Sequence, residues 1–179
     1  DCPWVLLYIE RWLKAPMQME DGSVVPRMAG TPQGGVISPL LANLFLHYAF
    51  DRWVVRTFPH IPFERYADDA ICHCRSADEA EALRSALADR FAACKLILHP
   101  EKTKIVYCKD ANRRGDFSNQ SFDFLGFKFR VRKALGRGRR AFACFLPAAS
   151  PKALTFIGRT IRRWTLHHHS DKSLQDLAE

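Results

Sequence analysis

Phe63-Glu64-Arg65-Tyr66-Ala67-Asp68-Asp69-Ala70-Ile71-Cys72 is the most informative stretch of the chain. Short apolar runs flank two adjacent carboxylates, a pattern that predicts two antiparallel strands with the acidic pair at their connecting turn. Neighbouring negative charges repel, and a divalent cation relieves this repulsion because magnesium prefers carboxylate oxygens. Phosphoryl transfer uses such sites, since its catalysis rests on positioning and charge neutralisation. The alternative for Asp68 and Asp69 is an ordinary polar turn.

A second informative segment lies upstream, Gly30-Thr31-Pro32-Gln33-Gly34-Gly35-Val36-Ile37-Ser38-Pro39-Leu40-Leu41-Ala42-Asn43. Its glycines allow the backbone to approach a flat ligand closely. Ser38 followed by Pro39 predicts a helix N-cap with proline at the first helical position. The alternative is a simple turn with a solvated Gln33.

Together the two segments resemble the reverse transcriptase family, in particular the bacterial group II intron-encoded reverse transcriptase/maturase branch. In that branch a Gly-Thr-Pro-Gln-Gly-Gly-Val-Ile-Ser-Pro-Leu-Leu-Ala-Asn block precedes Tyr-Ala-Asp-Asp. The resemblance continues through 98–106, a block that carries a lysine beside the incoming nucleotide, and through 122–127, the hairpin that grips the primer. Residues 150–179 resemble the start of the thumb, called domain X. The chain is therefore similar to most of a polymerase palm and the beginning of its thumb.

The resemblance implies an α+β fold. The expected palm is a split βαβ, ferredoxin-like antiparallel sheet with helices on one face, followed by the first helix of a helical thumb. The expected domains are residues 1–147, the palm with part of the fingers–palm junction, and residues 148–179, the start of the thumb.

The resemblance also implies roles for single residues. Asp68 and Asp69 would be catalytic and bind Mg²⁺, and Lys102 would bind the triphosphate or protonate the leaving pyrophosphate, with an exposed structural lysine as its alternative. Leu125 and Gly126 would form the primer grip. The residues expected to contact nucleotide or template are Thr31, Pro32, Gln33, Gly34, Tyr66 and Ala67.

One part of the family's site is not found where the family has it. The family uses three aspartates, the first on a strand before the helix that begins near Pro3. Asp1 is the only acidic residue before that helix, and it lies in Asp-Cys-Pro rather than in an apolar strand. The expectation is a palm without its first strand, an incomplete two-metal site and a chain inactive by itself. The uncovered sheet edge would allow self-association.

The charge balance favours a polyanionic partner. Among 179 residues, 27 Lys and Arg face 19 Asp and Glu, which gives a net charge of +8. Nucleic acid is the first expectation, and a membrane surface is the weaker one because no helix is both strongly amphipathic and lined with lysines. No apolar run is as long as a membrane span. The basic residues expected to contact phosphates are Arg130, Arg132, Lys133, Arg137, Arg139, Arg140, Arg159, Arg162 and Arg163.

The six cysteines form no Cys-x-x-Cys pair, which disfavours zinc. Cys72 and Cys74 share one face of the expected strand and are predicted to be reduced core thiols. A cytoplasmic location in a bacterium fits, at the nucleoid when the protein acts on DNA. The triplet His167-His168-His169 is expected to be solvated, because consecutive helical residues point in different directions.

Local patterns predict the remaining elements. Ser76 and Glu79 form a capping box, and the helix they open has Ala80, Leu83, Leu87 and Phe91 on one face. In chain order, the other expectations are a helix over 3–14, a hairpin over 17–28 turning at Asp21-Gly22, a buried helix over 40–58, strands over 95–98 and 104–108, an exposed loop over 109–120, a strand pair of 122–132 with 139–146, and a last helix with Leu154, Ile157, Ile161 and Trp164 on one face.

The sequence thus predicts an RNA-directed DNA polymerase of a group II intron that extends a DNA primer with deoxynucleoside triphosphates on an RNA template and also binds intron RNA as a maturase. One alternative is a reverse transcriptase of a retron, a diversity-generating element or a CRISPR adaptation module. Another is a non-catalytic RNA-binding maturase, which the intact Asp68-Asp69 pair disfavours.

Overall fold

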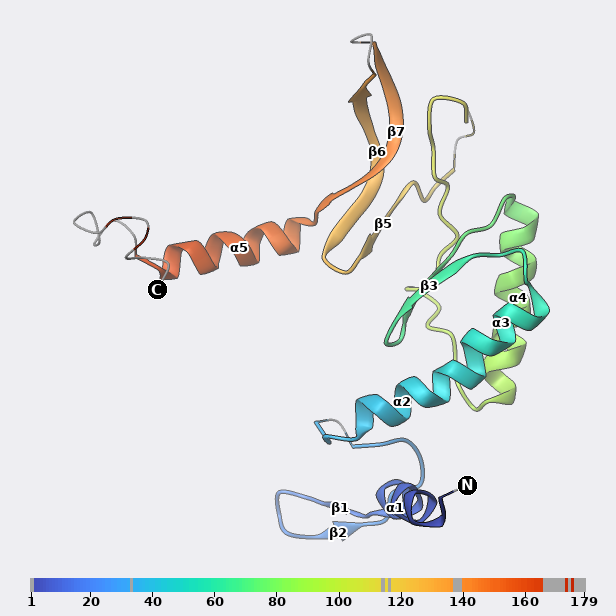
Figure 1. Ribbon diagram of the computed structural model, residues 1–179, viewed down its shortest axis with the longest axis vertical. Helices are drawn as coiled ribbons and strands as arrows, with labels where there is room; N and C mark the ends of the chain where they lie inside the picture. Colours follow the sequence, from blue (N-terminus) through green and yellow to red (C-terminus); the bar gives the residue numbers. More distant parts are fainter. Residues whose placement is uncertain are drawn as a thin grey trace. The chain divides into compact units, whose positions relative to one another are not determined.

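A computed structural model describes residues 2–32, 34–113, 115, 117–136, 140–165, 173 and 175. The chain forms two compact units, Asp1–Leu98 and His99–Glu179, each with its own helices and strands (Figure 1). The first contains α1 (Pro3–Lys14), β1 (Met17–Gln18), β2 (Val24–Val25), α2 (Ser38–Leu46), the π-helical turn η1 (His47–Asp51), α3 (Arg52–Thr57), β3 (Phe63–Tyr66), β4 (Asp69–Cys72) and α4 (Ala77–Ala93). The second contains β5 (Ser121–Phe124), β6 (Phe127–Leu135), β7 (Ala141–Ala149) and α5 (Pro151–Arg163).

The strands form three separate antiparallel sheets, β1–β2, β3–β4 and β5–β6–β7. This mixture of helices and small sheets is compatible with an α+β palm. The split βαβ arrangement and the division into palm and thumb at residue 148 stay predictions.

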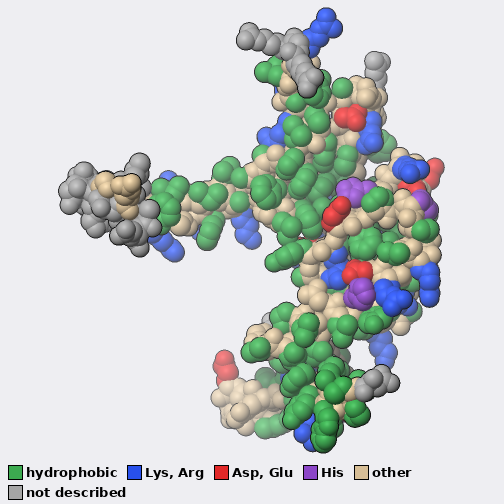
Figure 2. Space-filling view, viewed as in Figure 1, with side chains coloured by type: hydrophobic (Ala, Val, Ile, Leu, Met, Phe, Trp, Pro, Cys, Tyr) green, Lys and Arg blue, Asp and Glu red, His purple; other side chains and the backbone are tan. Residues whose placement is uncertain are grey.

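The two N-terminal predictions are confirmed. Helix α1 spans 3–14, and its Trp4 and Tyr8 side chains are exposed, within the hydrophobic surface that Figure 2 shows over this helix. Strands β1 and β2 pair in the register Met17↔Val25. Their turn contains Gly22 at φ 82°, and the Asp21 carboxylate accepts hydrogen bonds from the amide and hydroxyl of Ser23.

The segment α2–η1–α3 is helical as predicted, but it is buried along one side only. Leu41, Phe50 and Val54 are buried, whereas Leu40 and Phe45 remain 63% and 48% exposed. The expectation of a buried helix over 40–58 therefore holds for one side only, and apolar side chains on the other side stay exposed. The helix widens at η1, where the amide of Arg52 donates to the carbonyl of His47, five residues earlier.

The core of the first unit lies between the helices and the β3–β4 hairpin. Phe50, Val54, Ile61, Leu83 and Leu87 are buried together, and partly buried apolar side chains of both strands pack against them. Burial of such side chains is the main contribution to stability here.

Helix α4 begins as the capping box predicts. The Ser76 hydroxyl accepts a hydrogen bond from the Glu79 amide at 3.1 Å, and the Glu79 carboxylate accepts one from the amide of Arg75, just before the cap. Of the predicted face, Leu83 and Leu87 are buried and Phe91 is half-buried.

The strands predicted over 95–98 and 104–108 are wrong. Lys95 has φ 58°, and the amide of Leu96 donates to the Phe91 carbonyl, so the chain here closes the end of α4. Residues 104–108 have no strand ladder; the Tyr107 amide instead bonds the carbonyl of Asn119 across the predicted loop. Both segments are short runs of consecutive apolar residues, but in the described structure neither pairs with a strand.

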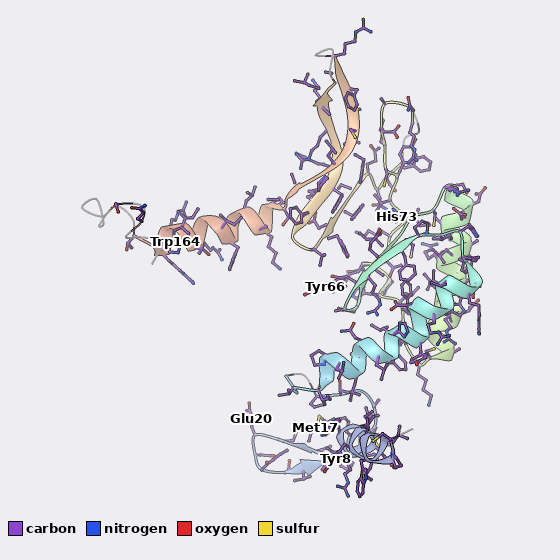
Figure 3. All side chains as sticks on the ribbon, in the orientation of Figure 1. Tyr8, Met17, Glu20, Tyr66, His73 and Trp164 are labelled. Atoms are coloured by element: carbon purple, nitrogen blue, oxygen red, sulfur yellow. The ribbon has the colours of Figure 1, made fainter. Side chains whose placement is uncertain are left out.

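The second unit has a three-stranded sheet, in which β6 pairs with β7 as predicted. The single strand predicted over 122–132 is two strands, because the chain turns at Leu125 and Gly126. Phe122, Phe129 and Phe145 stack on one face of it, with ring centroids 4.8 and 5.9 Å from Phe122. Helix α5 begins at the buried Ser150, whose hydroxyl accepts from the Ala153 amide at 3.1 Å. Its predicted apolar face is exposed, including the Trp164 that follows it (Figure 3). Among the described residues, no helix is long and apolar enough to cross a membrane.

Candidate active site

The acidic pair lies at the tip of the β3–β4 hairpin, as predicted. Tyr66 pairs with Asp69, so Ala67 and Asp68 alone form the connecting loop. Ala67 has φ 53°, a left-handed conformation. The first loop residue of a tight hairpin often has a positive φ, but glycine is the usual residue because other residues are strained there.

The two faces of this hairpin differ in their surroundings. Phe63, Arg65 and Cys72 share the face that packs toward the helices, and Phe63 meets Phe50 edge-on with ring centroids 5.2 Å apart. Tyr66 and Asp69 lie on the opposite face. Tyr66 is 64% exposed at the turn end of the hairpin (Figure 3).

Asp68 and Asp69 are both exposed, so their carboxylates are open to a ligand. Two adjacent carboxylates fit part of the oxygen ligand set that magnesium prefers. Within the described residues, no group of three or more His, Cys, Asp or Glu side chains is placed to hold a metal ion. Asp1 lies outside those residues. The turn therefore offers two carboxylate ligands and not a complete site.

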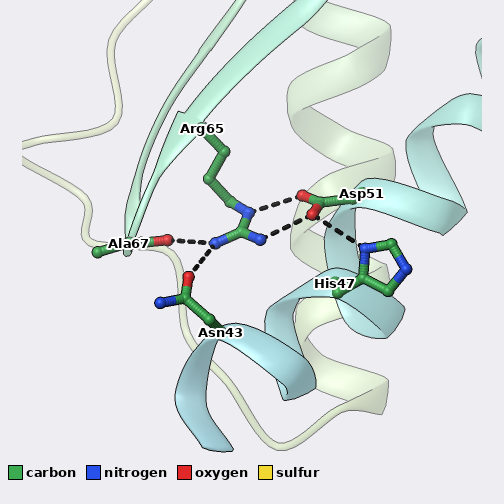
Figure 4. Close-up of polar contacts among 5 residues, drawn as sticks. All are labelled: Asn43, His47, Asp51, Arg65 and Ala67. Carbon is green, nitrogen blue, oxygen red and sulfur yellow. Dashed lines mark hydrogen bonds and ion pairs between the residues drawn. The ribbon is translucent and has the colours of Figure 1, made fainter. Parts of the chain in front are cut away.

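A polar cluster on the inner face holds this turn (Figure 4). Arg65 Nε and Nη2 donate to Asp51 Oδ1 and Oδ2 at 2.6 and 2.7 Å. Arg65 Nη1 donates to Asn43 Oδ1 at 2.9 Å and to the Ala67 carbonyl at 2.6 Å. His47 Nδ1 lies 3.3 Å from Asp51 Oδ2. The Arg65 guanidinium holds the pKa of the Asp51 carboxyl below its ordinary value, and Asp51 in turn raises the pKa of Arg65.

The thiols of Cys72, the last residue of β4, and of Cys74, two residues later, lie as predicted. Cys72 and Cys74 are free and pack against the core. Burial, with a smaller contribution from nearby Cys74, raises the pKa of the Cys72 thiol to about 12. A thiol that stays protonated is a poor nucleophile, so Cys72 has a packing role.

The glycine-rich segment forms a compact loop before α2. Thr31 and Pro32 are half-buried, Gly34 has φ 82°, and Gln33 lies outside the described residues. The Ser38 hydroxyl donates to the Pro32 carbonyl at 2.7 Å and so closes the loop. The prediction that Ser38 is the N-cap of α2 is wrong, because the N-cap is Ile37. A Cβ at Gly35 would lie 2.6 Å from Ser38 Oγ, which explains the glycine there.

Other predicted site residues belong to the second unit. Lys102 is exposed in a turn. Leu125 and Gly126 form the two-residue loop of the β5–β6 hairpin, with φ 49° and 80°. The amide of Ser150 donates to the Gly126 carbonyl at 2.8 Å and ties this loop to the start of α5.

The predicted phosphate-binding residues are dispersed over this unit. Arg130 and Arg132 lie on one face of β6, and Lys133 lies on the other. Arg140 is exposed, and Arg137 and Arg139 lie outside the described residues, as does the histidine triplet. The remaining three, Arg159, Arg162 and Arg163, are exposed on α5.

Sequence reasoning missed Asn43, Asp51 and the part that Arg65 plays. A signal was present, because strand alternation places Arg65 on the same side as Phe63. A charged side chain on the inner face of a hairpin requires a partner.

Comparison with known proteins gives one match, to a protein family. The family model described as reverse transcriptase (RNA-dependent DNA polymerase) matches residues 1–129. This match includes the glycine-rich loop, the Asp68 turn and the Leu125 turn. No curated protein and no solved structure matches the chain.

Proposed function

The chain belongs to the reverse transcriptase (RNA-dependent DNA polymerase) family, and we propose that it is the polymerase of a bacterial group II intron. Its substrates are an RNA template, a DNA primer and deoxynucleoside triphosphates. The observation that carries this proposal is the exposed Asp68-Asp69 pair on a fixed hairpin turn, within a chain whose family match includes that turn.

The residues of the turn suit nucleotide addition. Reverse transcriptases use divalent cations, and magnesium bound here would activate the primer 3′-hydroxyl and neutralise charge on the triphosphate. Asp68 and Asp69 supply carboxylate oxygens for it. Tyr66 presents an exposed ring beside them, suited to contact with the sugar or base of a bound nucleotide.

The other site residues take supporting roles in this proposal. Gln33 and Gly34 contact the nascent base pair, with Thr31 and Pro32 beside them in the sequence, and Leu125 with Gly126 grips the primer end. Lys102 binds the triphosphate or donates a proton to the leaving pyrophosphate. The exposed arginines of β6 and α5 contact phosphates without reading sequence.

We further propose that the protein acts as a maturase by binding intron RNA, which the net charge of +8 favours. The reduced core thiols suit a cytoplasmic location.

The catalytic site needs a carboxylate besides Asp68 and Asp69. Because no third carboxylate joins this pair in the described part of the chain, we propose that the 179 residues alone do not polymerise DNA. The test is primer extension on an RNA template with magnesium, comparing the 179-residue chain with the protein expressed from its complete open reading frame. We expect extension by the second only. Extension by the 179 residues would show that Asp1 or another of their residues completes the site, and extension by neither would contradict the polymerase assignment.

A further inference from the structure

The Arg65 side chain uses nearly all of its hydrogen-bond donors within one polar cluster. A guanidinium has five N–H donors in a rigid plane. Arg65 directs four donor contacts to three partners, the carboxylate of Asp51, the amide oxygen of Asn43 and the backbone carbonyl of Ala67. Only the last of these partners belongs to the hairpin turn. Arg65 therefore links the turn to a different part of the fold.

The anchoring side of this link is rigid. The paired bonds to Asp51 have the two-pronged geometry of the strongest arginine–carboxylate contacts. The Arg65 and Asp51 side chains are only 12% and 21% exposed, so water competes weakly for these bonds. Asn43 is itself fixed, because its Nδ2 donates to the Pro39 carbonyl at 3.1 Å.

The helix geometry places both anchors toward Arg65. Asn43 lies in α2, and Asp51 ends the π-helical turn η1. A π-helical turn inserts an extra residue and rotates the rest of the helix about its axis, and such turns occur often at functional sites. In Figure 4, Asn43 and Asp51 reach Arg65 from this one helical segment, and His47 lies beside Asp51.

The turn itself is closed by the pairing of Tyr66 with Asp69, and its backbone is strained. Ala67 carries a positive φ that is unfavourable for alanine, and the exposed Asp68 and Asp69 repel each other. A turn with these features would sample other conformations if its backbone were free.

We propose that Arg65 is a positioning residue for catalysis: anchored on Asp51 and Asn43, it holds the Ala67 carbonyl and thereby fixes the direction of the two metal-binding carboxylates. This inference rests on the proposed function. It assigns to Arg65 no contact with substrate. Misplacement of a reacting group by about 1 Å can lower a rate about a hundredfold, which sets the scale of the expected effect.

The test uses the protein from the complete open reading frame in four forms: wild type, Arg65→Ala, Arg65→Lys and the control Arg84→Ala. Arg84 also pairs with a carboxylate, that of Glu81, but on the exposed surface of α4. Three quantities are measured at a temperature where all forms are folded: amide hydrogen exchange of residues 67–69, binding of Mn²⁺ by electron paramagnetic resonance, and the magnesium dependence of primer extension.

We expect Arg65→Ala to speed exchange of the turn amides about tenfold, weaken Mn²⁺ binding severalfold and lower kcat by about ten- to a hundredfold, with little change in the KM for primer–template. Arg65→Lys should be intermediate, because an ammonium keeps the charge but lacks the planar fork. Arg84→Ala should match the wild type. Wild-type exchange and Mn²⁺ affinity in folded Arg65→Ala would overturn the proposal, as would a loss of thermal stability without any change in these two quantities.

If Arg65→Ala does not fold, Asp51→Asn and Asn43→Ala decide the question, since each removes one anchor and leaves Arg65 in place. Wild-type turn exchange and Mn²⁺ binding in both would overturn the proposal. Failure of the proposed function has a different signature. If the wild type extends no primer, the polymerase assignment fails, while turn exchange in the variants still decides whether Arg65 fixes the turn.

Discussion

The backbone of Ala67 shows how much one residue contributes to the geometry of the turn. Its φ of 53° places a methyl group in a conformation that suits glycine. A left-handed conformation costs a non-glycine residue about 1–2 kcal/mol. Ala67 is exposed, so the strain does not come from packing of its side chain. The hairpin register and the Arg65 contact impose it.

We therefore predict that Ala67→Gly changes stability differently from a glycine substitution nearby. Relief of strain offsets or exceeds the added flexibility of the unfolded chain, which costs about 0.5–1 kcal/mol, so the net gain lies between about 0 and 1.5 kcal/mol. Ala70→Gly, in the adjacent strand, is the control and should destabilise. Urea unfolding measures both. Equal destabilisation by the two substitutions would show that Ala67 is not strained.

Local sequence signals predicted correctly those helices and strands that are stabilised by contacts between residues close in sequence. The spacing of apolar residues in 3–14 predicted α1, and the Ser76–Glu79 capping box predicted α4. Both predictions are confirmed because helix and cap hydrogen bonds join residues only a few positions apart. The strand predicted over 104–108 is wrong because a strand requires a partner, and a short apolar run does not show whether one is present. The Arg65–Asp51 pair joins residues 14 apart, a distance at which no periodic pattern indicates contact.

The cap of α4 gives a direct prediction. Ser76→Ala removes the hydroxyl that accepts from the Glu79 amide and should lower the free energy of unfolding by about 1 kcal/mol. Ser85→Ala, at an exposed position in the middle of the same helix, is the matched control. Thermal or urea unfolding tests the difference. A Ser85→Ala protein as destabilised as Ser76→Ala would contradict the capping role.

The link between η1 and β3 predicts a pH dependence. Arg65 lowers the pKa of Asp51 in the folded protein, so the stabilisation is fully present above the ordinary value of 3.8 and is lost as pH falls through the lower folded pKa. His47 also faces this carboxylate. The stability difference between wild type and Asp51→Asn should therefore be large near pH 7 and shrink below 3.8. Urea unfolding at several pH values measures it, and a difference independent of pH would count against this pair.

For the entire chain, the sequence was enough to predict the family, but it did not predict how the residues of the site are arranged. The two motifs are local and carry their chemistry in their residue types, so Asp68-Asp69 was found at a hairpin turn as predicted. The ligands that would complete the metal site, and the path of nucleic acid over the arginines, depend on contacts between distant segments.

Nucleic-acid binding gives the prediction that depends on the chain's overall charge. Because the exposed arginines are expected to contact phosphates, affinity for RNA should fall linearly with salt on logarithmic axes. Arg162→Ala should reduce the slope by about one. Arg84→Ala, whose charge is already paired with Glu81, should leave the slope unchanged. An affinity that hardly responds to salt would indicate another kind of partner.

Metal binding by the Asp68-Asp69 turn during DNA synthesis on RNA is the property on which the proposed function depends. The most direct measurement is magnesium-dependent primer extension on an RNA template by the protein from its complete open reading frame, comparing wild type, Asp68→Asn and the control Asp78→Asn on the exposed first turn of α4. We predict that Asp68→Asn lowers kcat by at least about a hundredfold, the scale of losing a charged group from a transition-state site. RNA affinity should be retained, and Asp78→Asn should behave as wild type. Wild-type extension by folded Asp68→Asn would contradict metal binding at this turn.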